Sequence, residues 1–350
     1  MAAPLVQPFR TALGAHERME NLLFTVTLRD GTAGQGEAAI ATHITGETIQ
    51  ETRRHLEILG QELTGNEISD YCRLSAVLHE RLPHNKSVIA AVEGAVLDAL
   101  TRQREIPLWK LFGPKAVNLR SDITIVLADL KETETAVKKY FKKGFRAFKV
   151  KVGRDRDLDI KRVMSVQRLA PRSVIYIDAN QAFGADEALG FLQELKRAGI
   201  EPALLEQPVP REDLEGLKKV SRSTSVPVCA DESVRSLKDA IAVIKGKIAP
   251  VINIKLMKTG IVESRAIAYQ ARANNVKLMI GGMMESSLAM TTAAHLAAGL
   301  GCFDYVDLDT PFFIKSGWDR NPYLSASGVY TVSRVKQGVG ITTGDKMLCP

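Results

Sequence analysis

Residues 174–206 have the sequence VIYIDANQAFGADEALGFLQELKRAGIEPALLE, in which an apolar strand, an amphipathic helix and a second apolar strand follow one another. The apolar spacing predicts strands at 174–177 and 203–205 with a helix between them. A carboxylate comes directly after each strand, Asp178 after the first and Glu206 after the second. This stretch is therefore typical of one repeat of a parallel β/α fold with acidic residues at its strand ends.

The same repeat recurs from residue 119 onwards. Charged residues end or follow apolar runs at intervals of about 25 residues, the length of one strand plus one helix with its turns. Helical segments lie between the strands, and no clear helix follows the last strand. Eight parallel strands with crossover helices close into a barrel, whereas the alternative, an open doubly wound sheet, lacks its glycine fingerprint here. The predicted strands are 123–126, 145–152, 174–177, 203–205, 228–230, 251–254, 277–280 and 305–308.

Residues 1–118 follow a different pattern. Residues 21–29 and 32–40 are strand candidates on either side of the turn dipeptide Asp30-Gly31, which predicts a hairpin. Apolar residues then recur at helical spacing in residues 48–59 and 86–103, which predicts two helices. The sequence thus predicts a small α+β domain over 1–118 and a barrel domain over 119–325, with residues 326–350 returning to the first domain.

Composition excludes several classes of protein. The 350 residues include four scattered cysteines with no CxxC spacing, which indicates neither a disulfide framework nor a thiolate zinc site. No apolar run reaches the ~18 residues of a membrane span, so we expect a cytoplasmic protein with no membrane partner. The net charge of +7 comes without a basic patch interleaved with aromatic residues, and no nucleic-acid partner is predicted.

Three carboxylates are predicted to meet at the active face of the barrel. Asp178, Glu206 and Asp231 follow three successive strands, whose carboxyl ends form that face. They repel one another unless a cation joins them, and hard oxygen ligands favour Mg²⁺, with Mn²⁺ as a substitute. The alternative is that each carboxylate only caps the helix after its strand. Glu232 is expected to point away by strand alternation.

Two lysines are predicted to face each other across the same mouth. Lys149 and Lys151 share one face of the second strand, and Lys255 ends the sixth, which lies opposite in an eight-membered ring. Neighbouring positive charge brings a lysine pKa down and makes the amine a base. One base on each side of a carbon permits racemisation or epimerisation. The alternative is that the lysines extend to the solvated rim.

The eighth strand ends with Asp307 and Asp309, which share a face and lie opposite the strand of Glu206. A substrate that presents a carboxylate to the metal and a cation to these aspartates has the layout of a small dipeptide. The alternative is that the two aspartates only form an Asx turn closed by proline. Further residues are expected near this mouth, whereas His295 is interpreted as a core or interface histidine and Glu285 as a residue in the first turn of the next helix. The further residues expected near the mouth are Asn180, Gly282 and Met284.

The motifs FKVKVG, IDAN, LLEQPV, ADES, NIKLMKTGI, GGMMESSL and DLDTP together resemble the muconate-lactonising subgroup of the enolase superfamily, and most closely its dipeptide epimerases. The resemblance covers nearly the whole chain. It implies a capping domain over a modified TIM barrel, (β/α)₇β, which can form a homo-oligomer. It also implies Mg²⁺ on the three carboxylates and a dipeptide whose C-terminal residue is inverted at the α-carbon through an enediolate.

The resemblance assigns roles to single residues. Lys151 and Lys255 are implied to be the two acid/base catalysts, and Lys149 tunes Lys151 and contacts the substrate carboxylate. Asp307 and Asp309 are implied to bind the dipeptide ammonium. Other possible functions are an N-acylamino acid racemase, an o-succinylbenzoate synthase-like enzyme and an inactive barrel used as a binding scaffold.

This chain departs from its relatives at two places. Relatives begin with an extra strand before the segment matching 5–10, so we expect that strand to be missing or displaced here. Relatives that act on Ala-Glu carry an arginine where this chain has Gly14. The substitution disfavours Ala-Glu, and nearby Glu17 and Glu20 favour a basic or an uncharged substrate side chain.

Overall fold

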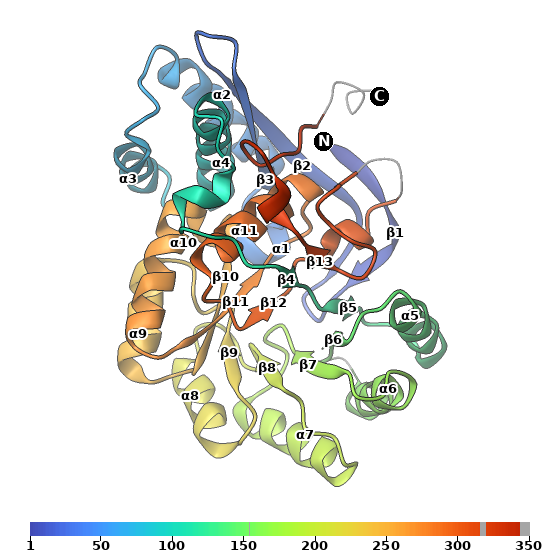
Figure 1. Ribbon diagram of the computed structural model, residues 1–350. Coiled ribbons are helices and arrows are strands. Elements are labelled where there is room, and N and C mark those ends of the chain that lie inside the picture. The colour runs from blue at the N-terminus through green and yellow to red at the C-terminus, as the bar shows by residue number, and fades with distance from the viewer. Residues whose placement is uncertain (154, 316–319, 344–350) are drawn as a thin grey trace.

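The structure of the protein, a computed structural model, describes residues 1–153, 155–315 and 320–343. Its strands form a three-stranded antiparallel sheet, an eight-stranded parallel sheet and a two-stranded pair. In Figure 1 the three-stranded sheet and the N-terminal helices lie at the top, and the larger sheet with its surrounding helices lies below. The predicted mixed α/β architecture is confirmed.

The N-terminal region folds as a small sheet backed by helices. The middle strand pairs on one side with the first strand and on the other with the third, where Thr27 lies opposite Ala33 across the predicted hairpin turn. The first strand contains the segment 5–10, and the absence or displacement of the strand that precedes this segment in relatives stays a prediction. The elements of this region are β1 (Ala2–Arg10), β2 (Ala15–Thr27), β3 (Ala33–Ala39), α1 (Thr42–Thr45), α2 (Ile49–Leu63), α3 (Tyr71–Arg81) and α4 (Lys86–Gln103).

Strand β3 packs directly on the buried helix α4. Two glycines of the strand, Gly34 and Gly36, face the helix backbone. A Cβ atom on Gly36 would lie 1.9 Å from the carbonyl oxygen of Ala91, which no side chain can tolerate. The sequence GQGEAA thus allows an approach of strand to helix that a larger residue would prevent.

The larger sheet follows the predicted repeat. All eight predicted strands are present and parallel, and the order in the sheet is the order in the chain. Its strands are β5 (Ile123–Ile125), β6 (Ala147–Lys151), β7 (Val174–Asp178), β8 (Leu204–Glu206), β9 (Val228–Ala230), β10 (Val251–Lys255), β11 (Lys277–Gly281) and β12 (Tyr305–Val306). Its helices are α5 (Leu130–Lys142), α6 (Arg156–Leu169), α7 (Ala185–Arg197), α8 (Leu214–Ser223), α9 (Leu237–Gly246), α10 (Leu256–Ala273) and α11 (Ser287–Leu300).

Hydrogen bonds join the two edge strands and close the ring. The backbone N–H of Asp122 donates to the Val306 carbonyl at 2.9 Å, and that of Leu308 donates to Ser121 Oγ at 2.8 Å. Strand β12 is followed by a short 3-10 helix, Thr310–Phe312, and by no α-helix within the described residues. These features agree with the (β/α)₇β barrel.

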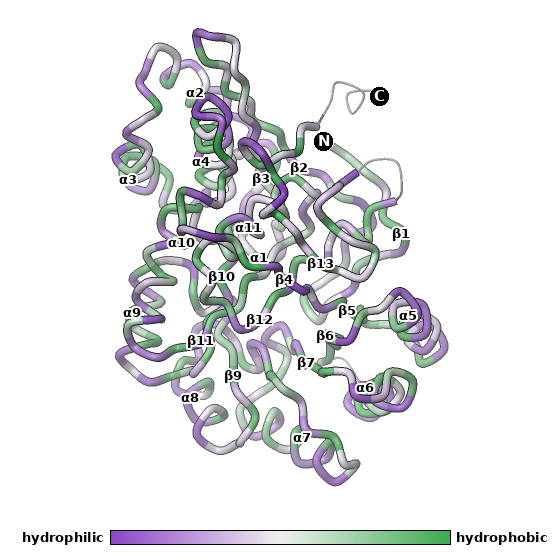
Figure 2. The backbone as a smooth tube through the Cα atoms, viewed as in Figure 1, coloured by the Kyte–Doolittle hydropathy of each residue, from purple (hydrophilic) through white to green (hydrophobic). Residues whose placement is uncertain are grey.

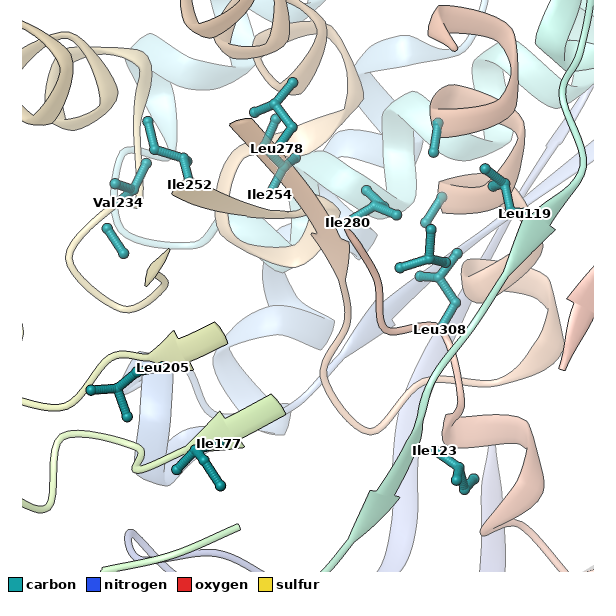
Figure 3. Close-up of a cluster of buried hydrophobic side chains, with 14 of the residues drawn as sticks. Leu119, Ile123, Ile177, Leu205, Val234, Ile252, Ile254, Leu278, Ile280 and Leu308 are labelled. Carbon is teal, nitrogen blue, oxygen red and sulfur yellow. The ribbon is translucent and has the colours of Figure 1, made fainter. Parts of the chain in front are cut away.

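Strand alternation separates the strand residues that pack against the outer helices from those that point into the barrel. One set of strand residues, including Ile177, Leu205 and Ile252, belongs to the main core (Figure 3). Helix residues such as Phe191 belong to the same core. Each fully buried side chain of this kind stabilises the fold by ~1.5–3 kcal/mol. The outer helices, such as α7, carry hydrophobic positions for this core and hydrophilic positions for solvent (Figure 2).

The interior set forms an apolar floor below the polar residues. Leu204, Cys229, Val251 and Met279 make a separate buried cluster. Glu206 lies two residues after Leu204 and therefore faces the same side of its strand, one layer closer to the carboxyl end. The floor seals the barrel, so the polar side chains above it can open only towards the N-terminal region.

Described residues of the C-terminal segment contact the N-terminal region. The pair formed by β4 (Leu119–Arg120) and β13 (Val329–Tyr330) lies beside the barrel. Farther along, Val339 N donates to Asp98 of α4 at 2.8 Å, and Thr343 N donates to Gln35 of β3 at 2.8 Å. Residues 344–350 of the predicted segment lie outside the described residues. The 118/119 domain boundary stays a prediction.

The cysteines and the apolar character of the helices were also subjects of the sequence analysis. The described cysteines, Cys72, Cys229 and Cys302, are free thiols. No described helix combines the length and the apolar character needed to cross a membrane.

Candidate active site

The predicted site residues meet at the carboxyl ends of the barrel strands. Strand register sets them side by side: Lys151 of β6 lies opposite Asp178 of β7, which lies opposite Glu206 of β8. Asp231 directly follows β9, and Lys255 ends β10. All of these side chains are buried. Parallel strands in one register therefore bring together residues that are far apart in the chain.

Each of the three predicted metal-binding carboxylates is paired with lysine. Lys151 Nζ lies 2.6 Å from Asp178 Oδ2, and Lys255 Nζ lies 2.6 Å from Asp231 Oδ2. Lys149 Nζ lies 2.7 Å from Glu206 Oε2. The ammonium groups therefore supply part of the positive charge that three buried carboxylates require, because Lys149 is shared with Asp178 and Asp307.

The carboxylates nevertheless remain in electrostatic conflict. Burial, followed by the nearby Asp178 carboxylate, raises the pKa of Glu206 to about 8. Asp178 is also buried, but its lysine neighbours lower its pKa to about 2. A divalent cation fits this set, because all three side chains offer hard oxygen atoms and Glu206 lacks a full counter-charge. Asn253 Nδ2 orients the other Glu206 oxygen, Oε1, from 2.8 Å.

Lys149 and Lys255 have raised pKa values in this arrangement. Burial alone lowers the pKa of Lys255, but Asp231 and Glu206 outweigh it and raise the pKa above its ordinary value. The same balance, with Asp307, Glu206 and Asp178 as neighbours, raises the pKa of Lys149. For Lys149 and Lys255, the contacting carboxylates therefore outweigh burial and neighbouring positive charge.

Lys258, which sequence reasoning missed, also binds the site. Its Nζ donates to Asp231 Oδ1 and to the Asp231 carbonyl, both at 2.6 Å, and to the Asn253 carbonyl at 3.0 Å. Its position one helical turn after Lys255, in NIKLMK, was the available signal. Lys258 therefore holds Asp231 from the side away from Lys255.

A second group of carboxylates lies on the other side of the barrel. Within the described residues, the trio of acids whose oxygens lie within 4.8 Å of one another is Asp122, Asp307 and Asp309. Asp309 Oδ2 accepts a hydrogen bond from Thr124 N at 2.5 Å. Burial and the neighbouring Asp307 raise the pKa of Asp309 to about 7. The predicted pair thus has a third member, Asp122, that the sequence did not indicate.

A cavity lies between these two groups and the small sheet. Lys149, Lys151 and Lys255 line it, whereas Asp178, Glu206 and Asp231 lie beneath the lysines and are fully buried. The other predicted contacts also line it, namely Asn180, Gly282, Met284, Asp307 and Asp309. The structure therefore collects the predicted substrate-binding set around one space.

The N-terminal region supplies the roof of this cavity. The rings of His16 of β2 and His43 of α1 contact each other, with centroids 4.6 Å apart and planes tilted by 59°. Burial, then the nearby His43, lowers the pKa of His16 to about 4, so its ring is neutral at pH 7. The whole set from this region is Phe9, Thr11, His16, Ala41, His43 and Ile44. Sequence reasoning missed these residues, because no periodic pattern marks them.

The structure confirms some of the remaining expectations for acidic residues and a histidine near the mouth and contradicts others. Glu17 and Glu20 are exposed and do not line the cavity, so the charge that was expected near the substrate is not there. Glu232 does not point away, because its Oε1 accepts from Asn180 Nδ2 at 3.2 Å. Glu285 lies just before α11 and accepts from Met283 N at 2.6 Å. His295 is a core histidine, as predicted.

Two family descriptions together match most of the chain. Residues 1–113 match the mandelate racemase / muconate lactonizing enzyme N-terminal domain, and residues 132–346 match the enolase C-terminal domain-like family. A hydrophobic dipeptide epimerase of Citrifermentans bemidjiense is 42% identical over 347 residues, which are 97% of this chain and 94% of that protein.

Solved structures agree in fold. The substrate-liganded L-Ala-D/L-Glu epimerase of Bacillus subtilis superposes with a TM-score of 0.93 at 32% identity, covering 97% of this chain and 96% of that one. A dipeptide epimerase of Enterococcus faecalis V583, complexed with Mg and L-Leu-L-Tyr, gives 0.91 at 30% identity with the same coverage. Such relatives make a divalent metal the expected cofactor of this fold. The chain belongs to the mandelate racemase and muconate lactonizing enzyme family of the enolase superfamily, and it is an isomerase of the racemase and epimerase type.

Proposed function

We propose that this protein is a Mg²⁺-dependent dipeptide epimerase that inverts the α-carbon of the C-terminal residue by proton transfer between two lysines. The observation that carries the proposal is the placement of Lys151 and Lys255 on β6 and β10, four strands apart in an eight-stranded ring, with both side chains lining one cavity. The named relatives that act on dipeptides support the same substrate class.

Each of the two lysines transfers a proton on one face of the substrate α-carbon. One amine removes the α-proton, and the ammonium on the opposite face returns a proton, so the configuration is inverted. The two lysines exchange these roles in the reverse reaction. Lys149 is assigned a different task, since its Nζ contacts three carboxylates, those of Asp178, Glu206 and Asp307. Its role in the proposal is to hold those carboxylates and to present one charge to the substrate carboxylate.

Asp178, Glu206 and Asp231 are the proposed metal ligands. When bound, Mg²⁺ supplies positive charge that offsets these carboxylates and stabilises the negative charge of the enediolate. The oxygen donors also suit Mn²⁺, which is expected to substitute. Asn253 and Lys258 keep Glu206 and Asp231 oriented through the hydrogen bonds described above.

Asp307 and Asp309 are proposed to bind the substrate ammonium. Both are buried, both line the cavity, and they follow the end of strand β12, which lies opposite the strand of Glu206. A dipeptide with its carboxylate near Glu206 and its ammonium near this pair places the α-carbon between the lysines. An N-acylated substrate has no ammonium for the pair, which disfavours the N-acylamino acid racemase and o-succinylbenzoate synthase alternatives.

The roof of the cavity favours an uncharged substrate side chain. Phe9 and Ile44 are apolar, and His16 and His43 are neutral at pH 7 because burial lowers their pKa values. Gly14 packs against the His43 ring and offers no charge for a glutamate side chain. We therefore expect apolar or aromatic dipeptides to react faster than L-Ala-L-Glu or L-Ala-L-Lys.

The test is incubation with these dipeptides in deuterated water with Mg²⁺, followed by NMR and chiral chromatography. The expected result is deuterium at the α-carbon together with inversion, fastest for an uncharged side chain. The N-acetyl derivative of the best dipeptide is the control and should react at least about tenfold more slowly, since a buried ionic contact is lost. Absence of α-exchange with every dipeptide would contradict the proposal, and a faster N-acetyl substrate would favour the racemase alternative.

A further inference from the structure

Asp122 lies behind the proposed ammonium-binding pair. It directly precedes β5 and is 1% exposed, and one of its carboxylate oxygens lies within 4.8 Å of oxygens of Asp307 and Asp309. Thr124, two residues later, lines the cavity with Asp307 and Asp309, whereas Asp122 is not among the lining residues. Asp122 therefore reaches the pair but not the substrate.

The hydrogen-bond donors around this trio are unequally shared. Asp307 Oδ2 accepts from Lys149 Nζ at 2.7 Å, and Asp309 Oδ2 accepts from Thr124 N at 2.5 Å. Neither oxygen of Asp122 accepts a hydrogen bond from any described residue. A buried carboxylate without a donor or an adjacent cation is costly, and two neighbouring carboxylates increase the cost.

A proton on Asp122 removes this conflict. The neutral acid has an O–H that can donate to Asp307, so an unpaired charge becomes a hydrogen-bond donor. Burial, followed by the charges of Asp307 and Asp309, raises the pKa of Asp122 well above its ordinary value, in agreement with the geometry. The opposed charge of Lys149 lies closer to Asp307, which favours Asp307 as the ionised partner.

We propose that Asp122 is a positioning residue that stays protonated and donates a hydrogen bond from its carboxylic acid to Asp307, fixing the Asp307 carboxylate between Lys149 and the substrate ammonium. The inference rests on the proposed function, because it takes the ammonium of a dipeptide as the ligand of Asp307. It adds a residue that touches neither substrate nor metal, yet determines how the ammonium is bound.

Two variants of similar size separate a proton donor from an anion. Asp122→Asn keeps a neutral donor, in its amide group, and is expected to retain kcat and KM within about threefold of the parent. Asp122→Leu fills the space without a donor and should raise the dipeptide KM by about tenfold or more with a smaller effect on kcat, as expected for loss of a hydrogen bond to a charged group. The exposed Asp186→Asn is the control. An Asn variant as impaired as the Leu variant, or a Leu variant with unchanged KM, would overturn the inference.

A second measurement needs no substrate. Infrared difference spectroscopy of the free protein near pH 8 should show the C=O band of a protonated carboxylic acid in the parent and its loss in Asp122→Asn. Absence of that difference would refute the protonated Asp122 even if the protein proves to be an epimerase. Its presence in a protein without dipeptide activity would leave Asp122 protonated and place the failure in the proposed function.

Discussion

The buried ammonium of Lys149 donates a hydrogen bond to Asp307 at 2.7 Å, and its other contacts are Glu206 at 2.7 Å and Asp178 at 3.1 Å. One lysine thus connects the proposed metal carboxylates with the proposed ammonium-binding pair. Because these carboxylates are buried, their charges depend on this single cation more than on solvent. The two halves of the site are therefore electrostatically coupled.

Lys149→Met tests this coupling. The variant keeps the volume of the side chain and removes the charge, so we expect it to lower the free energy of unfolding by about 3 kcal/mol without metal, because three buried carboxylates lose a partner. Added Mg²⁺ should restore part of that loss. Urea unfolding with and without Mg²⁺ measures both effects. Lys219→Met, which breaks an exposed ion pair with Asp186, is the control. It should change the free energy of unfolding by less than about 1 kcal/mol. Equal effects of the two variants would refute the coupling.

Lys151→Ala and Lys255→Ala, made separately, test the two-base assignment. Each should reduce epimerisation by about 10²–10⁴-fold, the usual contribution of a general base. Each should still exchange the α-proton of one enantiomer, and the two variants should differ in which one. Exchange followed by NMR for both enantiomers gives the answer. If either variant epimerised at the parent rate, that lysine would not be a catalyst.

Asp178→Asn, Glu206→Gln and Asp231→Asn test the metal site. Each removes one negative oxygen ligand, and we expect Mg²⁺ affinity measured by calorimetry to fall by about tenfold or more. Glu285→Gln is a matched control, since Glu285 is also buried near the mouth but binds Met283 N. Treatment with EDTA should abolish activity, and Mg²⁺ should restore it. Unchanged affinity in all three variants would place the metal elsewhere.

His295 predicts a pH dependence of stability. Its Nδ1 accepts from Trp109 N at 3.0 Å, its Nε2 lies 3.1 Å from the Val339 carbonyl, and burial lowers its pKa from 6.5 to about 3. Below about pH 6.5 the unfolded chain takes up a proton that the folded chain refuses, so stability falls with pH until the folded pKa is reached.

The comparison with His295→Gln isolates this contribution. Between pH 7 and about pH 4 the parent should lose about 3 kcal/mol more unfolding free energy than the variant, at about 1.4 kcal/mol per pH unit below 6.5. Urea unfolding at a series of pH values measures the two slopes. Parallel curves would mean that the folded protein protonates His295 without cost.

Gly36→Ala tests the close contact of β3 with α4. The added Cβ would meet the Ala91 carbonyl oxygen at 1.9 Å, and we expect a loss of about 3 kcal/mol or more in unfolding free energy. Gly60→Ala is the matched control, because its Cβ would meet only Phe24, at 3.8 Å, inside helix α2. It should stabilise by about 0.5–1 kcal/mol. Thermal unfolding distinguishes the two, and an unchanged Gly36→Ala midpoint would contradict the packing.

The barrel was predictable because its signals are local. The alternation of apolar strands with amphipathic helices located all eight strands, and the predicted helix 86–103 coincides with α4. Helix α3, Tyr71–Arg81, was missed, since it is short and buries only Ser75 and Leu78. The pairing of the first strand with β2 is a contact that no local pattern records.

The site, like the fold, has some features that local sequence predicts and others that only the tertiary structure reveals. Position at a strand end located Asp178, Glu206, Asp231, Lys151 and Lys255, because parallel strands share one active edge. The ionic partner of each charged side chain depended on the tertiary structure. Lys149 and Asp307, for example, are in contact although they are 158 positions apart in the chain. His16 and His43, from irregularly spaced parts of the small domain, reach the cavity only because that domain packs over the barrel.

By itself, then, the sequence determined the repeat, the polar residue at each strand end and the face of the strand on which it lies, because the periods of helix and strand are properties of neighbouring residues. Only the tertiary structure decided which carboxylate each lysine contacts, that Asp122 lies behind Asp307, and which residues roof the cavity. Those contacts depend on ring closure and on the docking of two domains, and sequence spacing carries no information about either.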